Sequence, residues 1–174
     1  TIWSLTPVPI PAIIPAIEGA SRFQLIKAAT PRVMNASENI VIITERVIFI
    51  FLYLTKRIAE ADRFARAGKY TGFDPNLLVG TELQGKVLGI VGHGRIGCKV
   101  AEVLQKAFGM KVLYYDVKRD MEAELRCAIT YASLDELVSQ ADVVSIHVPL
   151  LSSTQHLISG KELQLMKPTS FLVN

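Results

Sequence analysis

The sequence has few of the residues that mark metal, disulfide or nucleic-acid sites. Its two cysteines, Cys98 and Cys127, lie in no Cys-x-x-Cys motif and in no cluster with histidine, which argues against a zinc site and a disulfide framework. The net charge is only +3, and basic and acidic residues are interleaved, so no face has the single-sign potential that nucleic acid requires. We therefore predict no metal site, no nucleic-acid partner, and cysteines buried as thiols in a reducing cytosol.

The sequence also lacks a hydrophobic run long enough to cross a membrane. Its most apolar segment, residues 40–54, is interrupted by Thr44, Glu45 and Arg46, whereas a spanning helix needs about 20 predominantly apolar residues. The opening residues carry no basic leader and are rich in proline. We expect no membrane partner, a cytoplasmic location, and weakly specified chain over residues 1–39.

A long interdomain helix is predicted over residues 40–68. Asn35 and Glu38 have the spacing of a capping box, and Gly68 suits a C-terminal stop. Residues 47–54 are apolar on all sides, which favours burial against another domain or subunit, and the pattern then becomes amphipathic. A buried strand is an alternative for residues 40–43. The glycine-containing stretch 69–82 is typical of a linker.

From residue 83 onward, short apolar segments alternate with helical ones. Strands are expected at 86–91, 111–116, 142–148 and 170–174, with a short one near 128–131, and helices at 95–108, 134–140 and beyond 159. This order predicts an α/β fold, a Rossmann-like doubly wound parallel sheet over residues 83–174 that is truncated after about five strands. The last strand would then be an unpaired edge, which predicts an association-prone fold of marginal stability.

A glycine-rich loop follows the first of these strands. In GIVGHGRIG, Gly92 lets the chain turn off the strand, Gly94 leaves room for a diphosphate near the backbone, and Gly97 lets the next helix pack closely on the sheet. The free N–H groups and positive dipole end of that helix would face the diphosphate. The loop therefore predicts a dinucleotide site.

The second strand ends at Asp116, which is expected to read the ribose of the dinucleotide. A carboxylate at this position accepts hydrogen bonds from both ribose hydroxyls and repels a 2′-phosphate. NAD is therefore the expected cofactor, with NADP less favoured, although Lys118 and Arg119 could offer a phosphate some compensation.

Longer stretches of the sequence are also informative, namely LQGKVLGIVGHGRIGCKVAEVLQKAFGMKVLYYD, LDELVSQADVVSIHVPL, TQHLI and LQLMKPTSFLVN. Together they resemble the NAD-binding domain of D-isomer-specific 2-hydroxyacid dehydrogenases, over about residues 45–174. The resemblance implies Arg95 and Ile96 at the diphosphate, His147, Val148 and Pro149 on the adenine side, and Thr154 near the phosphates. It also implies a homodimer formed through residues 45–67.

The resemblance has limits at both ends. The family's catalytic arginine, acidic residue and histidine come after the strand that reads FLVN here, and residues 1–39 do not match its first, substrate-binding domain. No catalytic residue is assigned, because His93, His147 and His156 have no carboxylate at an evident orienting position. The resemblance implies a reductase of 2-oxoacids such as glyoxylate or hydroxypyruvate, with this chain inactive alone. A non-catalytic, corepressor-like NAD(H)-sensing module or an inactive fragment is the alternative.

Overall fold

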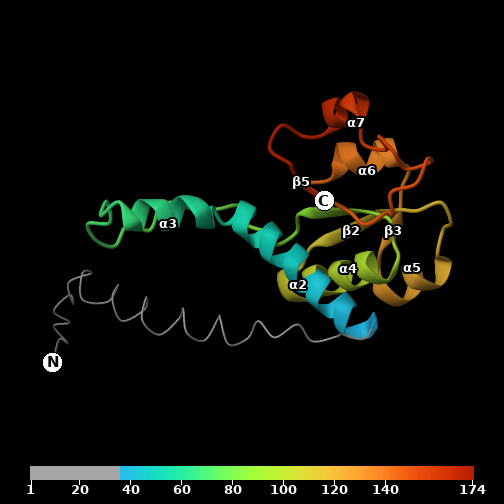
Figure 1. Cartoon of the computed structure of the whole chain (residues 1–174), viewed down its shortest axis with the longest axis horizontal. Helices are drawn as coiled ribbons and strands as arrows, with labels where there is room; N and C mark the ends of the chain where they lie inside the picture. The colour runs from blue at the N-terminus through green and yellow to red at the C-terminus, as the bar shows by residue number, and fades with distance from the viewer. Residues whose placement is uncertain (1–35) are drawn as a thin grey trace. The chain divides into compact units, whose positions relative to one another are not determined.

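A five-stranded parallel sheet forms the centre of residues 36–174, the part of the chain that the computed structural model describes (Figure 1). The strands are β1 (Val87–Val91), β2 (Lys111–Tyr115), β3 (Thr130–Tyr131), β4 (Val143–Ile146) and β5 (Phe171–Val173). Their order is β3-β2-β1-β4-β5, and each neighbouring pair is parallel. The predicted Rossmann-like fold class is confirmed, whereas most of the predicted N-terminal segment and Asn35 lie outside the described residues.

The first β-α-β unit follows directly from its sequence. Helix α4 (Arg95–Phe108) buries Val100, Ala101 and Leu104 on one face and ends at Gly109, whose φ of 63° is the left-handed conformation that glycine adopts without strain. β2 then returns beside β1 with Val87 opposite Lys111. The chain thereby brings the ends of β1 and β2 to the same edge of the sheet.

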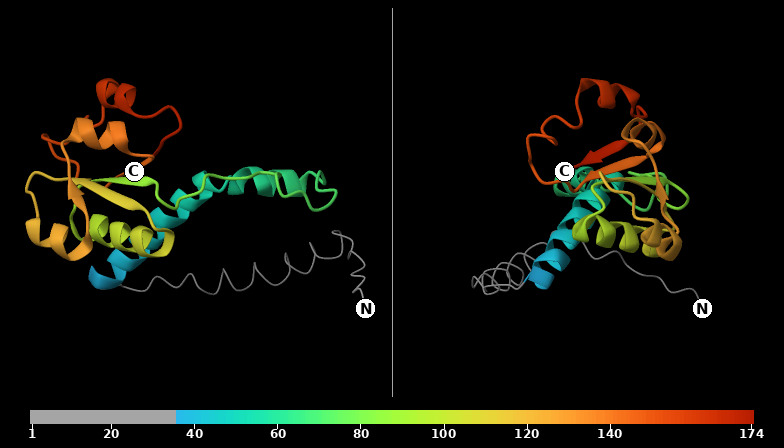
Figure 2. Two further views of the ribbon diagram at one scale, coloured as in Figure 1. Left: turned by 180° about the vertical axis from the view of Figure 1, so that it is seen from behind. Right: turned by 90° about the vertical axis from the view of Figure 1, so that its right-hand side faces the viewer.

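Helices cover both faces of the sheet (Figures 1 and 2). Helices α2 (Ala36–Thr55), α4 and α5 (Met121–Cys127) pack on one face, where the core includes Phe51, Leu88, Ile90, Leu104 and Tyr114. Helix α6 (Leu134–Gln140) covers the other face together with the region of α7 (Gly160–Leu165), where the core includes Val91, Leu137, Val138 and Val144. Two buried layers of this kind are what a doubly wound sheet requires.

Short-range capping signals fix the later helices. The Ser133 hydroxyl oxygen accepts the N–H of Glu136, and the Glu136 carboxylate accepts the N–H of Ser133 at 3.0 Å, so the two residues form a capping box at the start of α6. Ser159 and Glu162 form the corresponding box at α7. Helix α5 was not expected, yet its signal is present, because the Asp120 side chain accepts a hydrogen bond from the N–H of Ala123 at 3.0 Å.

The predicted single helix over residues 40–68 is instead two helices, α2 and α3 (Ile58–Arg66). The carbonyl oxygen of Thr55 accepts the N–H of Thr81 at 2.7 Å, so a segment distant in sequence takes the acceptor that a continuous helix would offer to residue 59. Arg57 adopts the left-handed conformation at φ 55° and restarts the chain as α3. The strand considered for residues 40–43 is wrong, because these residues lie within α2.

Helix α2 is buried on only one side. Thr44, Phe51 and Thr55 face the core, whereas Phe49 is 61% exposed and Ile50 and Tyr53 are also exposed. The apolar run therefore contacts the sheet domain with part of its surface and leaves a row of large apolar side chains uncovered. Within residues 36–174, no helix is long and apolar enough to cross a membrane.

Candidate functional site

The glycine-rich loop forms a tight bend between β1 and α4. Gly92 has φ 94°, and a Cβ there would lie 2.9 Å from the backbone carbon of His147. A Cβ on Gly97 would lie only 2.2 Å from the carbonyl oxygen of Gly92, so the helix can approach the loop this closely only with glycine. The bend is packed tightly on the side of the sheet and of α4.

The same loop is open on its other side. A Cβ on Gly94 would meet no atom within 4 Å in the described part of the chain. Gly94 is also the N-cap of α4 and has no side chain to satisfy the first N–H groups of the helix. The first helical hydrogen bond of α4 is the one that the Cys98 N–H donates to the Gly94 carbonyl oxygen at 2.9 Å. A glycine cradle beside an uncapped helix N-terminus fits the diphosphate of a dinucleotide.

Asp116 lies at the end of β2 and is fixed against the loop. Its Oδ2 accepts the backbone N–H of His93 at 2.8 Å. No other hydrogen bond reaches this carboxylate within residues 36–174. Asp116 is half-buried and faces a cavity, where the second carboxylate oxygen is available to a ligand.

Most of the predicted cofactor-binding residues line this one cavity, which has a volume of ≈ 270 Å³. Its walls include the glycines of the loop, Asp116 and the segment that follows β4, namely Gly92, Gly94, His147, Val148, Pro149 and Thr154. Three predicted residues do not line it. Arg95 is exposed at the first position of α4, Ile96 packs against the core beneath the sheet, and Gly97 is buried under the loop. We call this cavity, with the glycine loop, the cofactor cleft.

The cofactor cleft also contains residues that sequence reasoning missed. Tyr115 and Val117 flank Asp116, and Leu151, Ser153 and Leu157 come from the loop after β4. The alternation of strand residues could have indicated Tyr115. Nothing in the sequence indicates Leu151 or Leu157, because only the folding-back of the loop brings them to the cleft.

Thr154 closes that loop by hydrogen bonding within it. Its hydroxyl donates to the carbonyl of Pro149 at 2.5 Å and accepts the N–H of Leu151 at 2.8 Å. The hydroxyl proton is therefore already used in the loop, and the residue fixes the position of the wall formed by residues 149–154.

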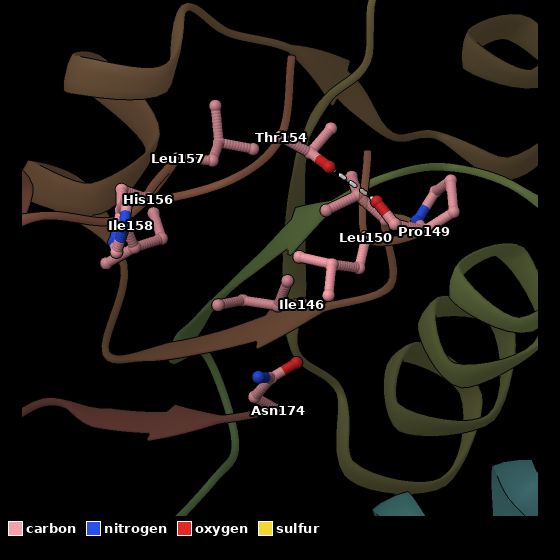
Figure 3. A pocket seen from close by; sticks show the side chains of 9 residues that line it. Ile146, Pro149, Leu150, Thr154, His156, Leu157, Ile158 and Asn174 are labelled. Carbon is pink, nitrogen blue, oxygen red and sulfur yellow. Dashed lines mark hydrogen bonds between the residues drawn. The ribbon is translucent and has the colours of Figure 1, made fainter. Parts of the chain in front are cut away.

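A second cavity of ≈ 370 Å³ continues from the same loop toward the end of β5 (Figure 3). It shares Val148, Pro149, Thr154 and Leu157 with the cofactor cleft and adds Ile146, Leu150, His156, Ile158 and Asn174. The two cavities lie at the carboxyl ends of parallel strands, the edge at which open α/β sheets bind ligands.

Burial lowers the pKa of two histidines near the site, His147 and His93. Burial lowers the pKa of His147 to about 4, and its Nε2 lies 2.9 Å from the Ser145 hydroxyl oxygen. Burial also lowers the pKa of His93, although Asp120 and Asp116 oppose the shift. The His93 ring packs against the Tyr114 ring with centroids 4.7 Å apart and the ring planes tilted by 43°. The His93 Nδ1 has no hydrogen-bond partner within residues 36–174.

Lys118 and Arg119, the two cations that follow Asp116, differ in whether an anionic side chain already pairs with them. Arg119 donates to both carboxylate oxygens of Glu124, at 2.7 and 2.8 Å, and its guanidinium lies 5.7 Å from the Tyr131 ring centroid. Lys118 is exposed and makes no ion pair in the described part of the chain. Among the described residues no group of histidine, cysteine and carboxylate side chains could hold a metal ion.

The sequence of the chain matches a known protein family. The model of the D-isomer specific 2-hydroxyacid dehydrogenase NAD binding domain matches residues 48–174. The chain is 41% identical over 162 residues to a glyoxylate reductase of Aeropyrum pernix, covering 91% of this chain and 47% of that protein. It is 31% identical over 174 residues to a glycerate dehydrogenase of Cucumis sativus, with 91% and 44% covered. The chain thus spans about half the length of these relatives.

Solved structures agree with the sequence comparison. The structure of the pyruvate reductase of Chlamydomonas reinhardtii superposes with a TM-score of 0.66 at 38% sequence identity. The match covers 74% of this chain and 37% of that one. The likeness therefore covers about three quarters of this chain, and the relative contains further chain outside the matched part.

Proposed function

The chain belongs to the D-isomer specific 2-hydroxyacid dehydrogenases, whose NAD binding domain it contains, and from this membership we propose that it holds NAD(H) for a reductase of 2-oxoacids. The reaction interconverts a 2-oxoacid and a D-2-hydroxyacid. Glyoxylate and hydroxypyruvate are the substrates we infer, because relatives carry the names glyoxylate reductase and glycerate dehydrogenase. The observation that carries the proposal is the single cleft joining the glycine loop to Asp116.

Each part of the cleft has a separate task in this proposal. The diphosphate lies in the space beside Gly94, against the N–H groups of Arg95 and Ile96 at the start of α4. The ribose hydroxyls donate to Asp116, whose carboxylate is already oriented by the His93 N–H. His147, Val148 and Pro149 form the wall on the adenine side, and Thr154 holds the adjoining loop.

Turnover also needs catalytic groups on the protein. Bound NAD(H) supplies the hydride, while the protein must supply a cation for the substrate carboxylate and a proton donor with a pKa near neutrality. His147 cannot donate at pH 7, because burial holds its pKa at about 4. We therefore assign no catalytic residue to this chain and propose that it binds cofactor without turnover when alone.

The charges at the end of β2 support NAD over NADP. Asp116 would lie next to a 2′-phosphate, and the repulsion of two anions in a half-buried site disfavours that cofactor. Of the two cations that follow Asp116, Arg119 is hydrogen-bonded to Glu124, so Lys118 is the one left to bind a 2′-phosphate. One exposed lysine offsets little of the cost, because exposed ion pairs contribute about 0–1 kcal/mol.

The exposed face of α2 supports a homodimer through residues 45–67. We also propose a cytoplasmic location. Phe49, Ile50 and Tyr53 form an uncovered apolar row, and rows of this kind are typical of protein interfaces. The second copy of the chain is the occupant we propose.

Titration of NADH by fluorescence, with Asp116→Asn and a matched control, tests the proposed cofactor role. The asparagine keeps an oxygen for the His93 N–H but removes the charge. Losing one charge-assisted hydrogen bond, which contributes about 1.5–3 kcal/mol, should weaken NADH binding at least about tenfold and narrow the preference for NADH over NADPH. Asp62→Asn, which removes an exposed carboxylate paired with Arg66 on α3, should leave both affinities unchanged.

The outcomes test the cofactor role. Equal affinity for NADH and NADPH, unchanged by Asp116→Asn, would contradict the ribose assignment. Tight NADH binding by a chain that never reduces glyoxylate, even as a purified dimer, is the expected result for this part of the protein. Failure to bind either cofactor would favour an inactive fragment over the NAD(H)-sensing alternative.

A further inference from the structure

A further cavity, rich in charged side chains, lies where the chain passes from β2 to α5. This charged cavity has a volume of ≈ 480 Å³ and is lined by His93, Asp116, Lys118, Arg119, Asp120 and Met121. Asp116 also lines the cofactor cleft, so the two cavities meet at this carboxylate. A phosphate group on a ribose bound by Asp116 would therefore lie next to the cavity that contains Lys118 and Arg119.

The Arg119 guanidinium lines the charged cavity but is already bound by Glu124 of α5. Its Nε donates to one carboxylate oxygen at 2.7 Å and its Nη2 donates to the other at 2.8 Å. Such a bidentate pair uses the planar donor edge of the guanidinium, which is also the edge that binds a phosphate group. The Glu124 side chain is 16% exposed and the Arg119 side chain is 56% exposed. The cation therefore faces the solvent-filled cavity with its charge already matched by a less exposed anion.

Glu124 is itself fixed by the core of the domain. The hydroxyl of Tyr114, a fully buried residue of β2, donates to Glu124 Oε1 at 2.9 Å and accepts the N–H of Asp120 at 2.7 Å. The hydrogen bonds from Arg119 and from Tyr114 lower the pKa of Glu124 to about 2, although burial opposes the shift, so the carboxylate is charged at neutral pH. Glu124 is therefore a fixed anion that holds Arg119 in one position beside the cavity.

We propose that Glu124 is a specificity-determining residue, which disfavours NADP(H) by keeping the Arg119 guanidinium from a 2′-phosphate. Glu124 does not touch the cofactor and acts through Arg119. The inference rests on the proposed function, in which Asp116 binds the ribose and repels a 2′-phosphate. Because Glu124 occupies the arginine, Lys118 is left to offset that repulsion in the charged cavity.

Fluorescence titration of NADPH and NADH against the parent chain, Glu124→Gln, Arg119→Ala and the double variant tests this role. Glutamine keeps an acceptor for the Tyr114 hydroxyl but removes the charge that pairs with Arg119. Glu124→Gln should strengthen NADPH binding about fivefold, the change that an exposed ion pair at the upper end of its usual range produces, and leave NADH binding unchanged. Arg119→Ala should give no gain for NADPH, and in the double variant it should abolish the gain that Glu124→Gln produces.

Glu122→Gln is the matched control, because it removes the same charge from the same helix. Glu122 is 87% exposed and lies 3.9 Å from Arg126 rather than beside Arg119. This variant should leave both affinities unchanged. An unchanged NADPH affinity in Glu124→Gln, an equal gain in Glu122→Gln, or a gain that persists without Arg119 would overturn the inference.

The proposed function and the role of Glu124 fail in different ways. A parent chain that binds NADH, with no effect of Glu124→Gln on NADPH, contradicts the role of Glu124 alone. A parent chain that binds neither cofactor contradicts the proposed function. In that case the NMR signal of the Arg119 Nε–H, identified by its loss in Arg119→Ala, still tests whether Glu124 withholds the guanidinium. Inorganic phosphate should shift this signal in Glu124→Gln and not in the parent chain, and equal shifts in both would overturn the inference.

Discussion

The substitution Gly94→Ala separates a glycine needed by a ligand from a glycine needed by the fold. Within residues 36–174, a Cβ at Gly94 would meet no atom within 4 Å, and the Gly94 φ of −77° is one that alanine adopts without strain. Alanine is a poorer N-cap than glycine, but it also restricts the unfolded chain, and each effect amounts to about 0.5–1 kcal/mol. The two oppose one another, so the free energy of unfolding should change by less than about 1 kcal/mol.

Cofactor affinity should change far more than stability in this variant. The added methyl group would occupy the space in which we place the diphosphate and hold it away from the N–H groups of α4. A loss of about 1.5–3 kcal/mol, the range for charge-assisted hydrogen bonds, corresponds to about 12- to 150-fold weaker NADH binding. Urea unfolding and NADH fluorescence titration measure the two quantities on the same preparation. A variant that binds NADH as tightly as the parent chain would refute the reasoning.

Three further predictions follow from the same contacts. Gly97→Ala should destabilise the fold by about 1–3 kcal/mol or more in urea unfolding, because its Cβ would lie 2.2 Å from the Gly92 carbonyl oxygen, and an unchanged midpoint would contradict the packing described. The pKa of His147, about 4, lies below its value in the unfolded chain. The free energy of unfolding should therefore be at its full value above about pH 6.5 and fall by about 3 kcal/mol as the pH drops to about 4. His147→Asn should flatten this pH dependence, and an equal decline in the variant and the parent chain would exclude His147 as its source. Phe49→Lys should shift the chain toward monomer in sedimentation velocity, whereas Glu122→Lys on exposed α5 should not, and an unaltered oligomer in both would rule out the α2 face.

The regular part of the fold could be predicted because its signals are local. The apolar run of β1, the helical spacing of α4 and the terminating Gly109 lie within a short stretch, and the bounds of α4 agree with the predicted 95–108. The break between α2 and α3 could not be predicted in this way. It depends on the Thr81 N–H reaching the Thr55 carbonyl, a contact between residues distant in sequence.

In the candidate site, too, the features that depend on local sequence could be predicted and those that depend on distant contacts could not. The tight turn at Gly92 and the close packing at Gly97 could be predicted because they depend on fixed offsets from the end of a strand, and the close contacts at both glycines agree with this prediction. The cofactor role of Asp116 depends on a similar offset and stays a prediction. The wall formed by Leu151 and Leu157 could not be expected, because it depends on hydrogen bonds within a folded-back loop. The pairing of Arg119 with Glu124 was likewise not predicted, although it occupies one of the two cations that follow Asp116.

Two-dimensional amide NMR of the ¹⁵N-labelled chain during addition of NADH tests the dinucleotide site most directly. The account predicts that the largest chemical-shift changes fall on the amides of residues 92–97, on Asp116 and on residues 147–149, with smaller changes elsewhere. Saturating NADH that leaves these amides unmoved, or that moves only residues outside the cofactor cleft, would contradict it.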